Sequence, residues 1–131
     1  HGDSSKMAEP NLINVTSIVG RTKLELLKDD GISHANASML TCAADKLIKI
    51  NSIIIANIDG TNSVNIDVAI NHHDHGRHYL AKTVAVPADS TLVVIGKDSP
   101  VYLEEGDELE ANASGDNDAD ICISYEELDD A

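Results

Sequence analysis

The chain has 131 residues, 42% hydrophobic and 24% charged, and its nine basic and 23 acidic residues give a net charge of −14. This charge argues against a nucleic-acid-binding protein, which needs a basic face. Three tyrosines and no Phe or Trp argue against a module that stacks bases or sugars on aromatic platforms. No apolar run approaches the ~20 residues of a membrane helix. We therefore expect an acidic globular protein that does not act on a membrane.

The domain organisation is simple. His1 to Lys6 precede Met7 and are interpreted as the remnant of an expression tag. The remaining residues, 7–131, fit one domain. The acidity is concentrated in residues 104–131, which contain twelve acids and no Lys or Arg. Such a segment is either a solvated surface or a face that repels its own copies and attracts a basic partner or a cation.

Nearly every periodic segment predicts a β-strand, because β-branched residues alternate with polar ones between turn signals. In chain order, the expected strands are Leu12–Val19, Thr22–Leu26, Ala35–Ala44, Lys46–Ile58, Val64–Ile70, Tyr79–Val86, Ser90–Ile95, Val101–Leu103, Glu108–Ala113 and Asp120–Tyr125. The last two are expected to form a hairpin. Eight to ten short strands with a turn about every ten residues are typical of an all-β sandwich, which we expect to be jelly-roll-like and antiparallel.

The period-two pattern also predicts which side chains form the core. These are Ile48, Ile50, Ile54, Ile66, Val68, Val84, Val86, Leu92, Val94, Leu109 and Ile121. Strict alternation then places Ile53 and Ile55 on the opposite face of their strand, where a sandwich normally has polar residues. Either both faces are buried within the monomer, or Ile53 and Ile55 form an interface between copies of the chain.

The most conspicuous cluster is histidine-rich: His72, His73, His75 and His78 lie within seven residues. A hairpin tip can converge several imidazoles, which bind transition metals. If the flanking residues pair, His72 and His78 would face each other. However, no Cys or second histidine-rich segment stands nearby in the sequence to complete a tetrahedral site. The alternative is an ordinary exposed loop.

A second candidate cation site is the acidic turn around Asp116 and Asp118, which carries oxygen ligands at alternate positions, as calcium loops do. Asp and Asn are also ordinary turn residues, so both interpretations stand. Cys42 and Cys122 are the only cysteines. We expect both to be free thiols within apolar strands, as in a protein that folds in a reducing compartment.

Nothing in the sequence indicates catalysis. It contains no nucleophile elbow, no Gly-rich phosphate loop and no Cys–His signature. Adjacent acids such as Glu104 and Glu105 would point to opposite faces of a strand and would not act as a pair. We therefore expect no enzymatic activity, no catalytic residues and no cofactor.

Several segments together resemble one family. They are Asn11–Gly20, Ile53–Asn62, Tyr79–Ile95, Val101–Leu109 and Ser124–Glu127. Their order resembles small virion proteins of tailed phages, of the type best represented in marine and cyanobacterial phages. The resemblance implies a small β-sandwich without known activity that decorates the capsid or associates with the tail. The histidine-rich loop and the acidic C-terminal segment depart from the family's turns, which leaves an added binding function open.

From the resemblance and the residues together we expect a virion structural protein that is made in the host cytoplasm. Its expected partners are copies of itself, as a trimer or another small cyclic oligomer, and capsid or tail proteins of the phage. The alternative is an adhesion module that binds a receptor or glycan, with a cation bound by the acidic turns.

Overall fold

The computed structural model describes residues 15–130, in which nine strands account for nearly all regular structure. The strands are β1 (Val15–Leu26), β2 (Ser38–Thr41), β3 (Lys46–Asn57), β4 (Val64–His72), β5 (Gly76–Val86), β6 (Thr91–Ile95), β7 (Val101–Leu103), β8 (Glu108–Ala113) and β9 (Ala119–Asp130). A single 3-10 turn, Ala35–Ala37, precedes β2. Among the described residues, no helix is both long and apolar enough to cross a membrane.

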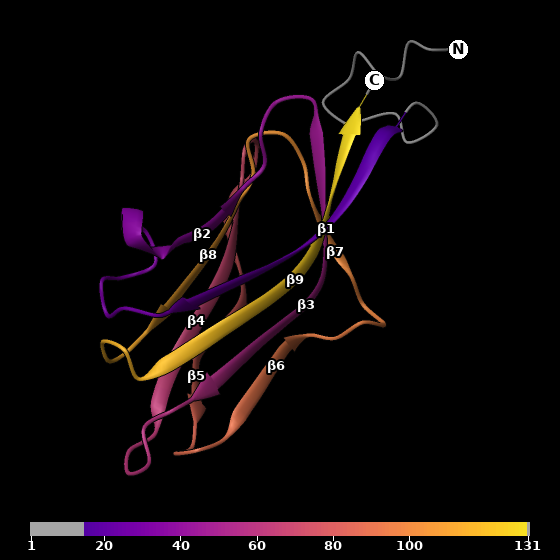
Figure 1. Cartoon of the computed structure of the whole chain (residues 1–131). Coiled ribbons are helices and arrows are strands. Elements are labelled where there is room, and N and C mark those ends of the chain that lie inside the picture. Colours follow the sequence, from indigo (N-terminus) through magenta and orange to yellow (C-terminus); the bar gives the residue numbers. More distant parts are fainter. Residues whose placement is uncertain (1–14, 131) are drawn as a thin grey trace.

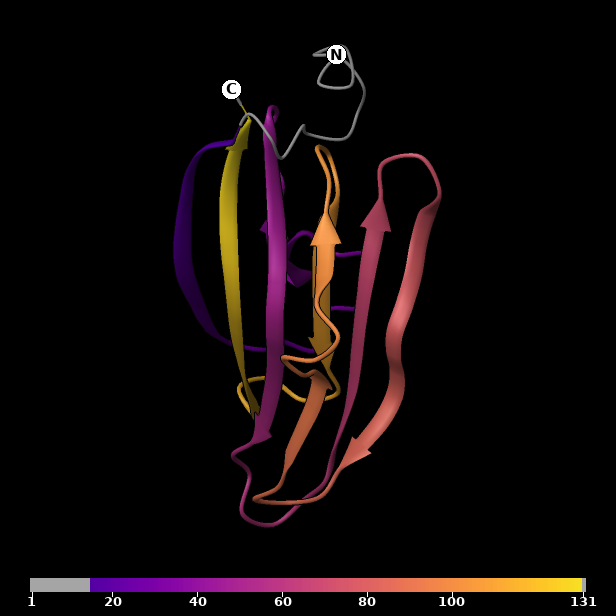
Figure 2. The same ribbon diagram turned by 90° about the vertical axis from the view of Figure 1, so that its right-hand side faces the viewer.

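The strands form two antiparallel sheets that face each other (Figures 1 and 2). One sheet has the order β1-β9-β3-β6, with β7 also paired to β3, and the other has the order β2-β8-β4-β5. Because β6 and β7 both pair with β3, they act as one edge strand interrupted at residues 96–100. This arrangement has the eight strand positions of a jelly roll, so the predicted all-β, jelly-roll-like sandwich is confirmed.

The first strand is longer than predicted. β1 runs without a break through Gly20, because Gly20 pairs with Glu126 of β9 in the middle of the ladder. The expected separate strands Leu12–Val19 and Thr22–Leu26 are therefore one strand. Residues 12–14, and the segment His1–Lys6 interpreted as a tag, lie outside the described residues.

A β-bulge in β3 decides which of its isoleucines face the core. Opposite β9, the pairing moves from Ile50–Tyr125 to Ser52–Ser124, so that Asn51 is an extra residue on β3. One extra residue reverses the side-chain alternation beyond it. Ile53 and Ile55 are fully buried as a result, and Ile54 is 36% exposed. The expectation of Ile54 in the core, and of an intermolecular interface at Ile53 and Ile55, is wrong for this reason.

Most of the other predicted core residues are confirmed. Ile48, Ile50, Ile66, Val68, Val86, Leu109 and Ile121 are buried in one cluster between the sheets. Leu92 and Val94 are half-buried and pack against this cluster. Val84 is also half-buried. Alternation therefore predicts most of the buried positions that were named, and places Val84, Leu92 and Val94 at the margin of the core.

The predicted C-terminal hairpin is not formed. β8 pairs with β2 and β4, whereas β9 pairs with β1 and β3 in the other sheet. The turn between them crosses from one layer to the other. The acidic segment 104–131 therefore contributes to both sheets, and one of its acids, Glu110, is buried in an ion pair with Arg77 at 2.7 Å.

The bulge generates a prediction about stability. Ile53→Ala and Ile55→Ala each empty a fully buried site and should lower the free energy of unfolding by about 2–5 kcal/mol. Ile54→Ala, one residue away, should lower it by less than about 1 kcal/mol because that side chain reaches solvent. Urea denaturation measures all three values. A larger loss for Ile54→Ala than for its neighbours would contradict the position of the bulge.

Candidate functional site: a histidine–carboxylate cluster and an apolar sheet face

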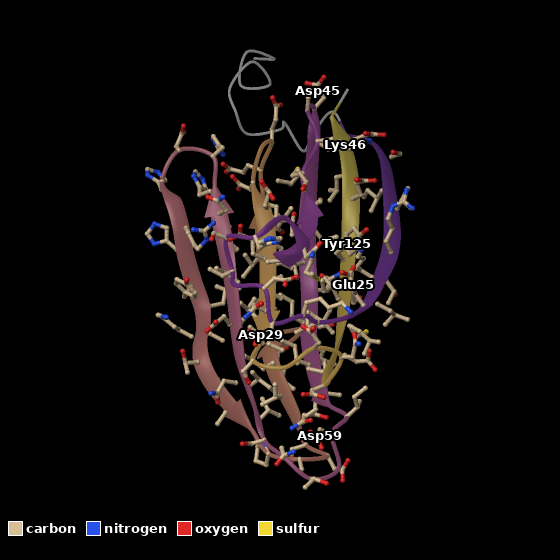
Figure 3. The ribbon with its side chains drawn as sticks, turned by 90° about the vertical axis from the view of Figure 1, so that its left-hand side faces the viewer. Glu25, Asp29, Asp45, Lys46, Asp59 and Tyr125 are labelled. Carbon is tan, nitrogen blue, oxygen red and sulfur yellow. The ribbon has the colours of Figure 1, made fainter. Side chains whose placement is uncertain are left out.

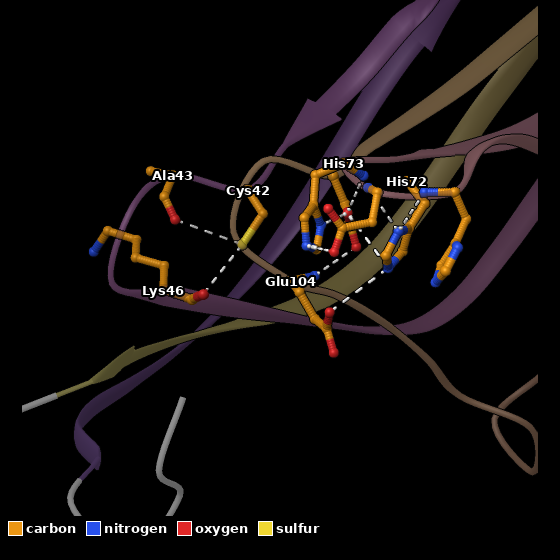
Figure 4. A network of polar contacts seen from close by, with 9 residues as sticks. Cys42, Ala43, Lys46, His72, His73 and Glu104 are labelled. Atoms are coloured by element: carbon orange, nitrogen blue, oxygen red, sulfur yellow. Dashed lines mark hydrogen bonds and ion pairs between the residues drawn. The ribbon is translucent and has the colours of Figure 1, made fainter. Parts of the chain in front are cut away.

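Two segments far apart in the sequence meet at one end of the sandwich. Asn71, near the end of β4, pairs with Glu108 at the start of β8. This pairing brings the turn after β4, residues 72–75, against the turn before β8, residues 104–107. Figure 4 shows His72, His73 and Glu104 at this junction, beside Cys42. Figure 3 shows the corresponding end of β3 at Asp45, with Asp59 at the far end.

Asp107 is the buried residue that connects the two turns of this junction. It is 1% exposed, and its carboxylate accepts hydrogen bonds from the backbone amides of His73 and Glu104, both at 2.9 Å. It also accepts a 2.7 Å hydrogen bond from Nδ1 of the His73 ring. Burial alone would raise the pKa of Asp107, but the His73 ring and the two amides outweigh burial and lower that pKa below its usual value.

The ring of His73 is the side-chain partner of this carboxylate. Because an ionised carboxylate only accepts hydrogen bonds, Nδ1 of His73 must donate. Its other nitrogen, Nε2, lies 3.2 Å from a carboxylate oxygen of Asp74. The hydrogen bond to Asp107, and next the charge of Asp74, raise the pKa of His73 above the ordinary value of 6.5 against an opposing effect of burial. His73 therefore remains protonated at a higher pH than an isolated histidine.

Gly106 allows the two turns to approach. Its φ is +88°, a left-handed conformation that side chains disfavour. A Cβ atom built there would lie 3.1 Å from Cβ of His73. Both the conformation and the close approach therefore require glycine. In the sequence, the only sign of this contact is the turn sequence Glu105-Gly106-Asp107.

His72 lies beside this pair with its ring in a defined orientation. Its Nδ1 accepts hydrogen bonds from the backbone amides of Asp74 at 3.1 Å and His75 at 3.2 Å. The proton of the neutral ring is therefore on Nε2. Nε2 points toward Glu104 at 3.7 Å and Asp107 at 4.0 Å. The rings of His73 and His75 stack on that of His72, with centroids 4.3 and 4.8 Å away.

Cys42 lies next to the cluster but contributes its backbone rather than its thiol. Its amide donates to the carbonyl of Asp107, and its carbonyl accepts from the amide of Gly106, both at 2.9 Å. Burial raises the pKa of the Cys42 thiol to about 11, so the thiol is protonated at neutral pH. Both cysteines are free, as predicted, although Cys122 lies on the outer face of its sheet rather than in the core.

The structure brings only two of the predicted metal ligands, His72 and His73, close to other ligand atoms. Among residues 15–130, the residues whose ligand atoms converge are His72, His73, Glu104 and Asp107. His75 contributes only a ring that stacks on His72. His78 pairs with Ile70, and His72 pairs with Gly76, so His72 and His78 do not face each other as predicted. Neither of these histidines joins the cluster. The sequence interpretation missed Glu104 and Asp107, because only the β4–β8 pairing shows that their turn meets the histidine loop.

The acidic turn at Asp116 and Asp118 has a structural explanation. A carboxylate oxygen of Asp116 accepts a 2.8 Å hydrogen bond from the amide of Asp29. The carbonyl of Asp118 accepts from the amide of Ile58 at 2.9 Å. Within the described part of the chain, these two residues do not belong to a converging group of metal ligands. These hydrogen bonds hold the turn against the segments that follow β1 and β3.

The second notable feature is an apolar row across the outer face of the five-stranded sheet. Leu24 pairs with Cys122, Cys122 with Ile54, and Ile54 with Val93, so the row crosses four strands without a charged residue. Leu24 is 71% exposed and Val93 is 58% exposed. We call Leu24, Cys122, Ile54 and Val93 the outer row.

β1 extends this apolar surface because its amphipathic pattern is inverted. Arg21, Lys23 and Glu25 pair with residues of β9 that face inward, so these charged side chains face the inner side. The alternate positions Ile18, Leu24 and Leu26, which face outward, are exposed hydrophobic residues. Inward-pointing charges on an edge strand such as β1 oppose edge-to-edge pairing with other sheets, and they leave the apolar side chains of this strand on the outer face.

A polar groove lies at the junction of β1, β9 and the β3 bulge, with a volume of about 360 Å³. It is lined by Gly20, Arg21, Thr22, Asn51, Ser124, Tyr125 and Glu126. Figure 3 shows Tyr125 on β9 in this region. The alternate positions Thr22, Ser124 and Glu126 give this groove hydrogen-bonding side chains.

Comparisons with known proteins leave the family open. No family model matches the chain, and no curated protein matches its sequence. One similar solved chain is from the structure of infectious bursal disease virus Gx strain, with 10% identity and a TM-score of 0.40 over 87% of this chain. Another is the Clostridium thermocellum endo-1,4-β-D-xylanase 10B CBM22-1–GH10 modules, with 12% identity and a TM-score of 0.36 over 94%. This chain spans 32% and 27% of their lengths.

The His73–Asp107 pair generates a prediction about pH. A histidine whose pKa is raised by folding stabilises the fold fully below 6.5, its ordinary value, and this contribution is lost as pH rises through the raised pKa. The free energy of unfolding should therefore fall as the pH rises above 6.5 and through the raised pKa of His73 in the natural protein, and fall less in His73→Gln. Urea denaturation at several pH values measures this. Equal slopes for the two proteins would contradict the assignment.

Proposed function

We propose that this protein is a non-enzymatic structural component of a tailed-phage virion, a capsid decoration or tail-associated protein that assembles as a homo-oligomer. The observation that carries the proposal is the exposed outer row with the inverted pattern of β1. The resemblance of several segments to phage virion proteins gives the context. Its partners are copies of itself and capsid or tail proteins, and its location is the virion after synthesis in the host cytoplasm.

The physical argument is the cost of leaving the outer row in water. Burying a Leu, Ile or Val side chain contributes roughly 1.5–3 kcal/mol relative to exposure. Leu24 and Val93 are mostly exposed in the monomer, so a contact over this face would recover much of that free energy. A cyclic oligomer or a virion lattice repeats the contact at every subunit, and many weak contacts then act together.

Charge determines where such a contact can form. The protein has a net charge of −14, so close approach of two copies is opposed over most of the surface. The outer row contains no ionisable carboxylate or amine. Its outward-facing neighbours on β1, β9 and β3 are Thr22, Leu26, Ser124, Ser52, Ala56 and Asp120, of which only Asp120 is charged. The row is therefore the part of this sheet where copies can meet with the least electrostatic repulsion.

This proposal is tested on the outer row. The double variant Leu24→Lys, Val93→Lys should convert an oligomer to a monomer in sedimentation or light scattering, because it places four charges at a contact between two copies. Leu80→Lys is the matched control, since Leu80 is an exposed hydrophobic residue of β5 in the other sheet. Mass spectrometry of purified particles tests the virion location directly.

Two outcomes would contradict the proposal. The first is a natural protein that is monomeric at high concentration and absent from particles. The second is an oligomer that persists in the double variant but dissociates in Leu80→Lys, which would place the contact on the other sheet.

The second candidate function is an adhesion module that binds a receptor or glycan, and the polar groove beside Tyr125 is the observation that favours it. Hydroxyl-rich ligands suit a groove lined by Thr22, Asn51 and Glu126. A glycan array with and without calcium separates the two functions. Binding that is lost in Glu126→Gln, which alters the groove without removing core packing, would favour adhesion over assembly.

A further inference from the structure

The histidine–carboxylate cluster contains a gap that its hydrogen bonds do not fill. Nε2 of His72 is 3.7 Å from Glu104 and 4.0 Å from Asp107, which are too long for hydrogen bonds. The candidate ligand atoms of His72, His73, Glu104 and Asp107 all lie within 4.8 Å of one another. Around a four-coordinate ion with bonds of about 2.0–2.2 Å, neighbouring ligand atoms are about 3.3–3.6 Å apart. The four groups are therefore close enough to enclose an ion once the turn of residues 73–75 rearranges.

From this arrangement we infer that His72, His73, Glu104 and Asp107 bind one divalent transition-metal ion, with Zn²⁺ as the best match. Two imidazole nitrogens and two carboxylate oxygens form a donor set that suits Zn²⁺, whereas Mg²⁺ and Ca²⁺ prefer oxygen ligands alone. The two carboxylates neutralise the charge of the ion. His72 and Glu104 are only half-buried, so an ion can enter from solvent.

The site is built on a rigid base. Asp107 is fixed by two backbone amides and is almost fully buried. Gly106 and Cys42 fix the turn that carries it through paired backbone hydrogen bonds. The protonated thiol of Cys42 is directed toward the carbonyl of Lys46, with Sγ 3.3 Å from that oxygen. The ion would therefore be bound by nitrogen and oxygen without a thiolate.

Binding of the ion requires one proton to leave His73 and one proton to change position on the His72 ring. The proton that Nδ1 of His73 shares with Asp107 is released to solvent, which frees Nδ1 as a ligand. The proton of neutral His72 moves from Nε2 to Nδ1, and Nε2 then binds the ion. Nδ1 of His72 can no longer accept hydrogen bonds from Asp74 and His75. The turn of residues 73–75 is therefore the part of the site that must rearrange.

The metal-free full chain is titrated with Zn²⁺ in a calorimeter. We expect one ion per chain, release of protons measured in buffers of different ionisation enthalpy, and a melting temperature that rises by several degrees with bound metal. His72→Gln and Glu104→Gln should each weaken binding roughly tenfold or more. His78→Gln is the matched control, because it removes a histidine of the same hairpin that lies outside the cluster.

Two further measurements identify the ligands. In amide NMR spectra, Zn²⁺ should shift the signals of Asp74 and His75 most strongly, because those amides lose their acceptor. With Co²⁺ in place of Zn²⁺, the absorption spectrum should lack a thiolate–metal charge-transfer band. Circular dichroism and thermal unfolding without metal confirm that each variant is folded, so that lost binding reports on the ligand.

Four results would overturn the inference. They are no saturable Zn²⁺ binding up to about millimolar concentration, equal weakening by His78→Gln and His72→Gln, unchanged binding in both His72→Gln and Glu104→Gln, or a thiolate band with Co²⁺. The third would assign the ion to histidines elsewhere in the chain, and the fourth would assign it to a cysteine. None of these results bears on assembly through the outer row, so this inference and the proposed function stand or fall separately.

Discussion

The extra residue Asn51 in β3 is the constraint on which both faces of the five-stranded sheet depend. Before the bulge, Ile48 and Ile50 face the core, and after it Ile53 and Ile55 do so. Without the extra residue, strict alternation would direct two of these four side chains to solvent. The same bulge turns Ile54 outward into line with Leu24, Cys122 and Val93. One insertion therefore completes the core on one side and the outer row on the other.

The opposite sheet depends on buried polar contacts at its outer side and at one end. Glu110 is buried with Arg77, at 2.7 and 3.1 Å, and Asn112 accepts hydrogen bonds from the amides of Asp30 and Gly31. Asp107 connects the β4–β5 turn to the turn before β8. A buried carboxylate without such partners would be strongly destabilising, so these acids fix the loops that satisfy them. Part of the acidity of the chain therefore determines loop positions rather than surface charge.

The two candidate sites use different physical properties of the same sandwich. The outer row presents apolar side chains on the outer face of one sheet. There, a large contact area and the absence of charge favour association with another surface. The histidine–carboxylate cluster lies in two neighbouring turns, which bring together groups that are distant in the sequence. Association through the outer row, as proposed, would leave these turns accessible. A metal ion bound there would connect the tip of β4–β5 to the body of the fold without altering the outer row.

The sequence alone determined the fold class, the approximate extents of most strands and many of the buried core positions, because period-two alternation is a local property. It also identified the histidine-rich loop and the free cysteines. The bulge at Asn51 was not predictable, since an inserted residue changes the outcome only when the partner strand is known. The meeting of His72 and His73 with Glu104 and Asp107 depends on the β4–β8 pairing across more than thirty residues. Strand pairing at long range is set by the packing of whole sheets, so only the tertiary structure decided which isoleucines are buried and which acids reach the histidines.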